Sequence, residues 1–345
     1  MRIRRTFPIV VAVLAIAVAV TIAVELRKHA PPEAARLLPG ADAFFYLDLR
    51  MARRANSGNP LPAVSHDPEY EKFIQQTGFQ FERDLDEAAF AAHYAVGVAG
   101  SNPEPRFSEV FVGKFQSERL TSYLRGIAKS VEDYHSVEIF TIPIENRTLR
   151  VAVLSADSIA ASNHNDPSVI QGIIDRSQRL ASPFGGPSLL RQYYRHVQLG
   201  SLAWLVARIE PSLPQFAGWS NFLPHPANLV ISASYNPLHL PMHQGGIHLR
   251  AEAFAQSAED AQALTDRVGV FLALTGSAEA AVGMHGTDPD VKALFDSIKV
   301  KQEGERAVLT ATMPLAFLHK MLSGSEPVVN KPAPGPSPQK PAKSR

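Results

Sequence analysis

"SERLTSYLRGIAKSV", residues 117–131, is the stretch that decides how the middle of this chain should fold. Its charged side chains occupy one face of a helix, and its apolar side chains fall at helical spacing on the other: Leu120, Leu124, Ile127 and Val131. A helix with one apolar stripe needs a surface on which to bury that stripe. The segments on either side of it should therefore supply a sheet.

Strand-like segments lie on both sides of this helix. They are short, rich in β-branched and aromatic residues, and bounded by turn-forming residues. Two precede the helix and two follow it: HYAVGVAG (93–100), SEVFVGKF (108–115), EIFTIPI (138–144) and LRVAVLS (149–155). The last two are predicted to form a hairpin that turns at residues 145–147, and FFYLDLR (44–50) is predicted to be an earlier strand.

The second half of the chain repeats this order of elements. Two strands, a helix and two strands are predicted there: ANLVISASY (227–235), GGIHLRAEAF (245–254), SAEDAQALTDRVGVFLAL (257–274), IKVKQ (298–302) and AVLTATM (307–313). Hairpins give antiparallel sheets, and the sequence therefore predicts an α+β fold. We expect two related lobes, residues 41–200 and 201–325, each with helices packed on one face of its sheet.

The N-terminal segment TFPIVVAVLAIAVAVTIAV (6–24) contains no charged residue. As a helix it would span about 28 Å, close to the roughly 30 Å thickness of a membrane's hydrocarbon core. Arg2, Arg4 and Arg5 precede it, and the positive-inside rule then places the N-terminus in the cytoplasm. We expect residues 1–25 to be a cytoplasmic tip and single-pass anchor in a bacterial cytoplasmic membrane. The bulk of the chain would lie in the periplasm or outside.

A cleaved signal peptide is the alternative for the same segment. Ala17-Val18-Ala19 is a candidate cleavage site, although the apolar run is longer than a usual signal peptide's. Both alternatives place the rest of the chain outside the cytoplasm. Residues 26–40 are predicted to be a linker, and residues 326–345, rich in proline and lysine, a disordered tail.

Composition excludes several classes of function. The formal net charge is +1, without the basic excess of a nucleic-acid-binding protein. The chain has no cysteine, which excludes disulfides, thiol catalysis and thiolate metal sites. No G-x-S-x-G elbow, P-loop or dinucleotide fingerprint is present. The sequence therefore predicts no cofactor and names no catalytic residue.

The acidic segment DPEYEKFIQQTGFQFERDLDEAAFAA (67–92) is explained by local structure. Asp67 is predicted to cap a helix that ends at Gly78. Asp84 is predicted to cap a second helix, with Glu87 completing a capping box. An acid–base pair or a cation site is the alternative, but the spacing fits no calcium-binding loop.

Two groups of residues are the other candidate sites. His239, His243 and His248 could bind a metal, although no HExxH motif accompanies them, and loop or strand-edge histidines are the structural alternative. Trp219 and Phe222 could form an exposed aromatic binding surface, with packing in the core as the alternative.

Three motifs and the exported anchor resemble uncharacterised bacterial envelope-anchored proteins with an extracytoplasmic α+β module. The motifs are LPGADAFFYLDL (38–49), TGFQFERDLDE (77–87) and FVGKF (111–115), and the resemblance covers residues 37–322. That group has no established activity, so the resemblance implies no site residue.

The sequence thus favours a non-enzymatic binding or scaffolding module of the bacterial envelope. It would contact the membrane through residues 6–24, and an envelope protein is the candidate partner. The alternative is an exported hydrolase or metal-dependent enzyme whose active-site residues are dispersed along the chain.

Overall fold

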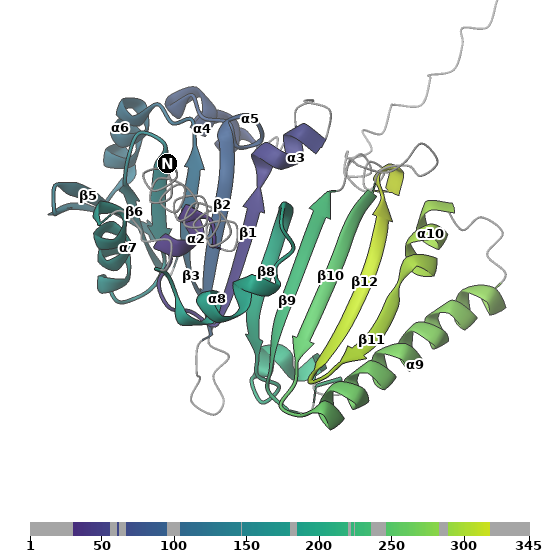
Figure 1. The fold of residues 1–345 in the computed structure, drawn as a ribbon. Coiled ribbons are helices and arrows are strands. Elements are labelled where there is room, and N and C mark those ends of the chain that lie inside the picture. Colours follow the sequence, from purple (N-terminus) through teal and green to yellow (C-terminus); the bar gives the residue numbers. More distant parts are fainter. Residues whose placement is uncertain are drawn as a thin grey trace, which may run out of the picture.

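One large sheet and the helices that flank it make up the computed structural model, which describes residues 30–55, 61, 67–94, 104–145, 147–179, 185–219, 222–223, 225–235, 246–282 and 289–317 (Figure 1). The strands are β1 (Ala43–Asp48), β2 (Leu85–His93), β3 (Arg106–Gly113), β4 (Ser130–Tyr134), β5 (Val137–Ile144), β6 (Arg147–Val153), β7 (Ser158–Ser162), β8 (Ser201–Ile209), β9 (Ala227–Tyr235), β10 (Gly246–Phe254), β11 (Lys299–Glu303) and β12 (Arg306–Pro314). The helices are α2 (Glu33–Leu37), α3 (Leu49–Ala55), α4 (Pro68–Thr77), α5 (Phe81–Asp84), α6 (Ser117–Ile127), α7 (Ser168–Gln178), α8 (Ser188–Tyr193), η1 (Tyr194–His196), η2 (Pro214–Trp219), α9 (Ala258–Val282) and α10 (Pro289–Ser297).

The twelve described strands form a single sheet in the order β11-β12-β10-β9-β8-β1-β2-β3-β7-β6-β5-β4. Every neighbouring pair in this order is antiparallel. At the centre, β1 pairs with β8 and joins the strands of the first half to those of the second. The α+β class and the antiparallel pairing predicted from the sequence are confirmed, but the two expected lobes share one sheet instead of having one each.

The two halves of the sheet follow a similar path. In the first, β1, β2 and β3 form a meander, α6 follows, and later strands return until β7 pairs with β3. In the second, β8, β9 and β10 form a meander, α9 follows, and β12 pairs with β10. A half-turn about an axis perpendicular to the sheet, between β1 and β8, would exchange β7 with β12 and β6 with β11. Among the described strands, the hairpin of β4 and β5 has no counterpart in the second half.

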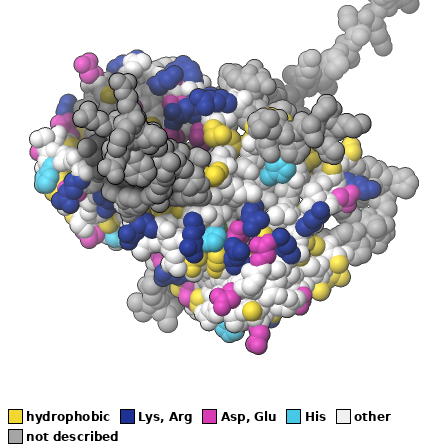
Figure 2. All heavy atoms as spheres, viewed as in Figure 1, with side chains coloured by type: hydrophobic (Ala, Val, Ile, Leu, Met, Phe, Trp, Pro, Cys, Tyr) yellow, Lys and Arg dark blue, Asp and Glu magenta, His cyan; other side chains and the backbone are white. Residues whose placement is uncertain are grey.

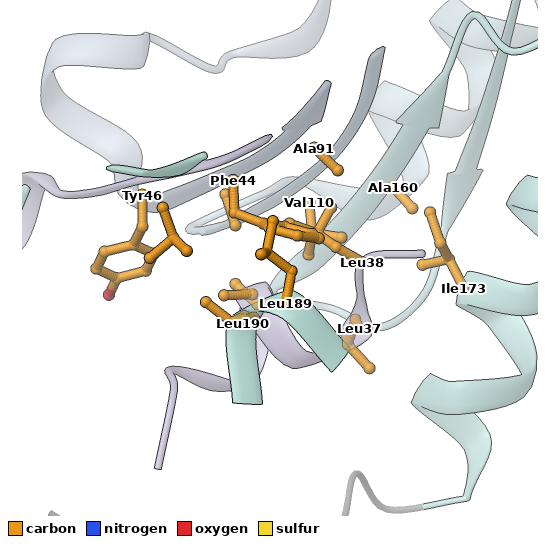
Figure 3. Packing of buried hydrophobic residues seen from close by; sticks show 14 of the residues in the cluster. Leu37, Leu38, Phe44, Tyr46, Ala91, Val110, Ala160, Ile173, Leu189 and Leu190 are labelled. Atoms are coloured by element: carbon orange, nitrogen blue, oxygen red, sulfur yellow. The ribbon is translucent and has the colours of Figure 1, made fainter. Parts of the chain in front are cut away.

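The main core lies on the front face of the sheet, which we define as the face that carries α2, α7 and α8 (Figures 1 and 3). Phe44, Val110 and Ala160 point from three strands toward these helices, where they meet Leu38 and Ile173. Removing a large apolar side chain from water contributes about 1.5–3 kcal/mol. The front face of the first-half strands is therefore a major source of stability.

The opposite, back face carries α6 and α9. Leu120 and Leu124 of α6 are buried against β5, β6 and β7, and Leu264 of α9 packs beside the aligned pair Ala253 and Ala307. The predicted apolar stripe of residues 117–131 is thus only half buried. Ile127 is the last residue of α6 and Val131 belongs to β4, and both side chains are exposed.

Helices cover both faces of the first-half strands, so the expectation of helices on one face is wrong there. The reason is that α7 carries three fully buried isoleucines, which pack against the front face of the sheet: Ile170, Ile173 and Ile174. Part of the predicted 26–40 linker also belongs to the core. Ala34 and Ala35 are small enough for α2 to lie close to β2 and β3, and both are fully buried.

The helix predicted to begin at Asp84 is also wrong. One short turn, α5, ends at Asp84, and Leu85–His93 forms β2 between β1 and β3. Ladder bonds on both sides outweigh the helix preference of the alanines in this segment. The preceding helix is confirmed: Asp67 accepts a hydrogen bond from the Tyr70 N–H at 2.8 Å, and Gly78 ends α4 at φ 72°.

The predicted anchor, residues 6–24, and the predicted tail, residues 326–345, lie outside the described residues. Within the described ranges, no helix combines the length and the apolar character needed to cross a membrane.

Candidate functional site

A grid of mostly polar side chains covers the front of the second-half strands. We call it the open face, and it consists of the front-facing residues of β9, β10, β12 and β11. Cross-strand partners share a face, and the register therefore orders these side chains in rows. The rows are Ser234–His248–Thr312, Ser232–Arg250–Thr310–Lys299, Val230–Glu252–Val308–Lys301 and Asn228–Phe254–Arg306–Glu303.

No described helix stands in front of the middle of β9, β10 and β12 (Figure 1). Charged side chains of both signs gather over these strands in the space-filling view (Figure 2). The first half differs at the equivalent place, where α7 packs through Ile173 on β7 and its buried Ala160. On β12, the strand related to β7 by the half-turn, the front-facing residues include Thr310 and Thr312. The open face is therefore uncovered over the middle of its strands, whereas α7 covers its counterpart.

A buried carboxylate organises the charges of the open face. Glu252 is 3% exposed, and each of its oxygens binds one guanidinium. Arg250 Nε donates to Oε1 at 2.7 Å, and Arg306 donates to Oε2 at 2.8 Å. The Arg306 guanidinium also lies 5.8 Å from the centre of the Phe254 ring. A buried charge is tolerated when it is paired and hydrogen-bonded, and here the pairing fixes two arginines that are themselves partly exposed.

Two more groups complete this cluster. Hydrogen bonding from Lys301, and the charges of the nearby basic residues, hold the pKa of Glu303 below its usual range. His196, on η1, lies 3.4 Å from Glu252. Burial lowers the pKa of His196; the Glu252 charge opposes this effect, and the arginines around it add to it. The imidazole is therefore held toward its neutral form.

A hollow of about 410 Å³ opens beside this cluster. It lies where β10, β12 and β11 meet α10, and its polar lining consists of Gln198, His248, Asp296, Ser297, Lys299, Thr310 and Thr312. Ser297 Oγ accepts from the Thr312 N–H at 2.8 Å and ties α10 to the edge of β12. His248 Nδ1 and the Thr312 hydroxyl share a hydrogen bond of 3.2 Å. The hollow thus has a fixed wall of groups that can form hydrogen bonds.

A smaller hollow of about 180 Å³ lies on the same face, toward β1. Its lining includes Tyr46, Tyr194 and Trp204, whose rings pack on one another. Gln198 lines both hollows, and Ser234 Oγ donates to its Oε1 at 3.0 Å. The aromatic hollow and the polar hollow are therefore neighbours that share Gln198 as a lining residue.

A separate cluster of charges holds α3 against β1 and β2. Asp48 accepts from the Met51 N–H at 2.7 Å, Arg50 pairs with Glu87, and Arg53 pairs with Asp86. Burial raises the pKa of Glu87 more than the Tyr46 hydroxyl bond and the Arg50 charge lower it. Asp86 and Glu87 are thus engaged from a strand, and the predicted capping box does not exist.

Only one of the three residues predicted as a metal site, His248, lies within the described ranges. His239 and His243 lie outside the described residues, and His248 is one of the side chains of the open face. In the part of the chain that is described, no group of three metal-ligating side chains is found.

The predicted aromatic surface is also only partly described. Trp219 ends η2, but its side chain is outside what the structure describes. Phe222 is half-buried and packs edge-on against Phe271 at 5.8 Å, which favours the core-packing alternative for this ring.

Sequence reasoning missed the open face. Its signal was present in GIHLRAEAF, where His248, Arg250 and Glu252 alternate with apolar residues on β10. An alternating pattern places these three side chains on one face of a strand. What the pattern could not give is the partner strand β12, which supplies Arg306 and Thr310 from far along the chain.

Comparison with known proteins assigns no family. No protein-family model and no curated protein matches this chain. Three solved structures described as crystal forms III, IV and I of TP0453 are similar, with TM-scores of 0.42, 0.41 and 0.42 and sequence identities of 9%, 10% and 9%. They cover 85%, 85% and 86% of this chain, and 99%, 97% and 98% of their own chains. Likenesses this distant carry no argument about what this chain does.

Proposed function

We propose that this protein is a membrane-anchored, extracytoplasmic binding or scaffolding module of the bacterial envelope, built from two related lobes, and that the open face is its binding surface. The observation that supports this proposal is the contrast between the halves. α7 covers the sheet surface in the first half, whereas no described helix stands in front of the middle of the mostly polar surface in the second. A surface built of fixed arginines, hydroxyls and an amide suits recognition of a polar component of the envelope.

Site-specific photo-cross-linking in cells tests the binding surface. A photoreactive amino acid at Thr310, in the open face, should form a cross-link to an envelope component. The same amino acid at Ser122, which is exposed on α6 on the other face of the sheet, is the matched control. Equal cross-linking from both positions, or none from Thr310, would contradict the open face as the binding surface.

Reporter fusions test the anchor separately. A reporter fused after residue 40 should be active only if it is one that works outside the cytoplasm, and the protein should stay with membranes after a carbonate wash. Activity of a reporter that works only in the cytoplasm would refute the proposed topology. The support for this part of the proposal is the uncharged segment 6–24 behind three arginines.

An exported hydrolase is the second candidate, and Glu87 is the feature that favours it. A carboxyl group whose pKa is raised by burial, next to the hollow that Tyr46 lines, is a candidate general acid. Hydrolysis of a panel of nitrophenyl esters and glycosides by the wild type, lost in Glu87→Gln, would support this alternative. Turnover that is equal in the two proteins would reject it.

A further inference from the structure

The side chains of the open face carry more positive charges than negative ones. Four basic side chains face outward from its strands, Arg250, Lys299, Lys301 and Arg306, against two carboxylates, Glu252 and Glu303, a net charge of +2. Both carboxylates are already engaged by basic groups on the same face, Glu252 by the two arginines and Glu303 by Lys301 and Arg306. The remaining positive charge is available to a ligand.

Lys299 places part of that charge at the larger hollow. Its side chain is exposed, and it makes no ion pair with any residue that the structure describes. Around it, Thr310 offers a hydroxyl from β12, and Gln198, which also lines the hollow, offers an amide. Arg250 occupies the same cross-strand row as Thr310 and Lys299, and Glu252 holds it there. One wall carries the opposite charge: Asp296, on α10.

We propose that this hollow binds the phosphate group of an anionic ligand, an inference that rests on the open face being a binding surface. A phosphate has several acceptor oxygens, which suits donors that converge from three elements, whereas a carboxylate would leave some of them unused. Lys299 supplies the ion pair, and the Thr310 hydroxyl and the Gln198 amide supply neutral donors. Asp296 repels the ligand and limits its affinity.

Titration of the full chain in nanodiscs of a neutral glycolipid, which carries no phosphate, tests the proposal. The probes are inorganic phosphate and glycerol 3-phosphate, followed by calorimetry, and phosphatidylglycerol vesicles, followed by co-sedimentation. Binding of the soluble probes would indicate a free phosphate compound, and binding of the vesicles alone would indicate a lipid headgroup. Lys299→Gln should weaken binding about ten-fold, and Asp296→Asn should strengthen it several-fold, because each change alters one charge at the hollow.

The control is Lys292→Gln, which removes an exposed lysine of α10 that does not line the hollow. It should leave binding unchanged. Equal weakening by Lys292→Gln and Lys299→Gln would show general charge attraction and overturn the proposal, and so would weaker binding by Asp296→Asn. If no probe binds while Thr310 still cross-links in cells, the ligand class is wrong and the binding function stands.

Discussion

Asp84 shows how one side chain closes a turn of helix on itself. Its Oδ2 accepts from the Gln80 N–H at 2.9 Å, four residues earlier, and its carboxylate also pairs with Arg83. Burial raises the pKa of Asp84, but the bonds from Arg83 and the Gln80 N–H together outweigh burial and leave the pKa lowered. The carboxylate is therefore structural, although it ends a helical turn instead of starting one.

Replacement of Asp84 should separate this role from that of an N-cap. Asp84→Ala should cost about 1 kcal/mol, the usual loss for one hydrogen bond to the backbone. Asp84→Asn should retain most of that stability, because the amide oxygen reaches as far as the carboxylate oxygen, whereas the shorter serine should not. Denaturant unfolding measures the three variants. Full recovery by serine would point back to an N-cap.

His196 should make the stability of the fold depend on pH. Its pKa is lowered in the folded state, chiefly by burial, so that the unfolded chain takes up a proton first as the pH falls. Below about pH 6.5, the usual histidine value, unfolding therefore becomes more favourable, until the pH reaches the lowered pKa. The groups that face the ring are Glu252, Arg306, Arg250 and the adjacent Arg195.

His196→Asn should flatten this part of the dependence. Unfolding free energies measured at steps between pH 7.5 and 5 should fall less steeply in the variant than in the wild type. The same slope in both proteins would mean that other groups set the pH response.

At the scale of elements, Gly113, the last residue of β3, lies against the backbone of Asp84, the last residue of α5 before β2 begins. A Cβ added there would lie 2.5 Å from the Asp84 carbonyl oxygen, and backbone cannot move aside as a side chain can. Gly113→Ala should therefore destabilise the protein by about 1–3 kcal/mol. Gly126, in the last turn of α6, is the matched control, since a Cβ there meets no atom within 4 Å.

Gly126→Ala should be neutral or stabilise the protein by up to about 0.5 kcal/mol, because alanine is the better helix former. Thermal melting of the two variants measures the difference. A loss of stability at Gly126 as large as that at Gly113 would show that contact with Asp84 is not the cause.

Elements with a strong local pattern could be predicted from the sequence. The caps of α4 are set by Asp67 and Gly78, and the turn between β11 and β12 by Gly304 at φ 63°. β2 could not be predicted from LDEAAFAA, because its strand state depends on pairing with β1 and β3. The open face could not be predicted as a site, since its rows combine strands from distant parts of the chain.

At the scale of the whole molecule, one core spans both halves of the chain. Phe44 and Val110 come from the first half and Trp204, Val206 and Val230 from the second, and they belong to the same buried cluster. Elements that share a core unfold together. We therefore expect a single transition for the described body, even though its two halves follow similar paths.

Two probes test this cooperativity. In a Trp219→Phe background, Trp204 fluorescence reports on the centre of the sheet, and hydrogen exchange at β5 and β6 reports on its far end. Their denaturant midpoints should coincide. Two separate midpoints would show that the halves unfold independently.

The central position of β1 has a consequence for the growing chain on the ribosome. One edge of β1 is completed by β2, but the other waits for β8, at residues 201–209. At usual synthesis rates this wait lasts roughly 8–30 s. An unpaired edge accepts any strand of matching geometry, and two copies of β1 from neighbouring nascent chains could pair antiparallel, as β1 and β8 do. Until β8 emerges, the first half is thus a potential partner for its own copies, and translation speed sets how long that competition lasts.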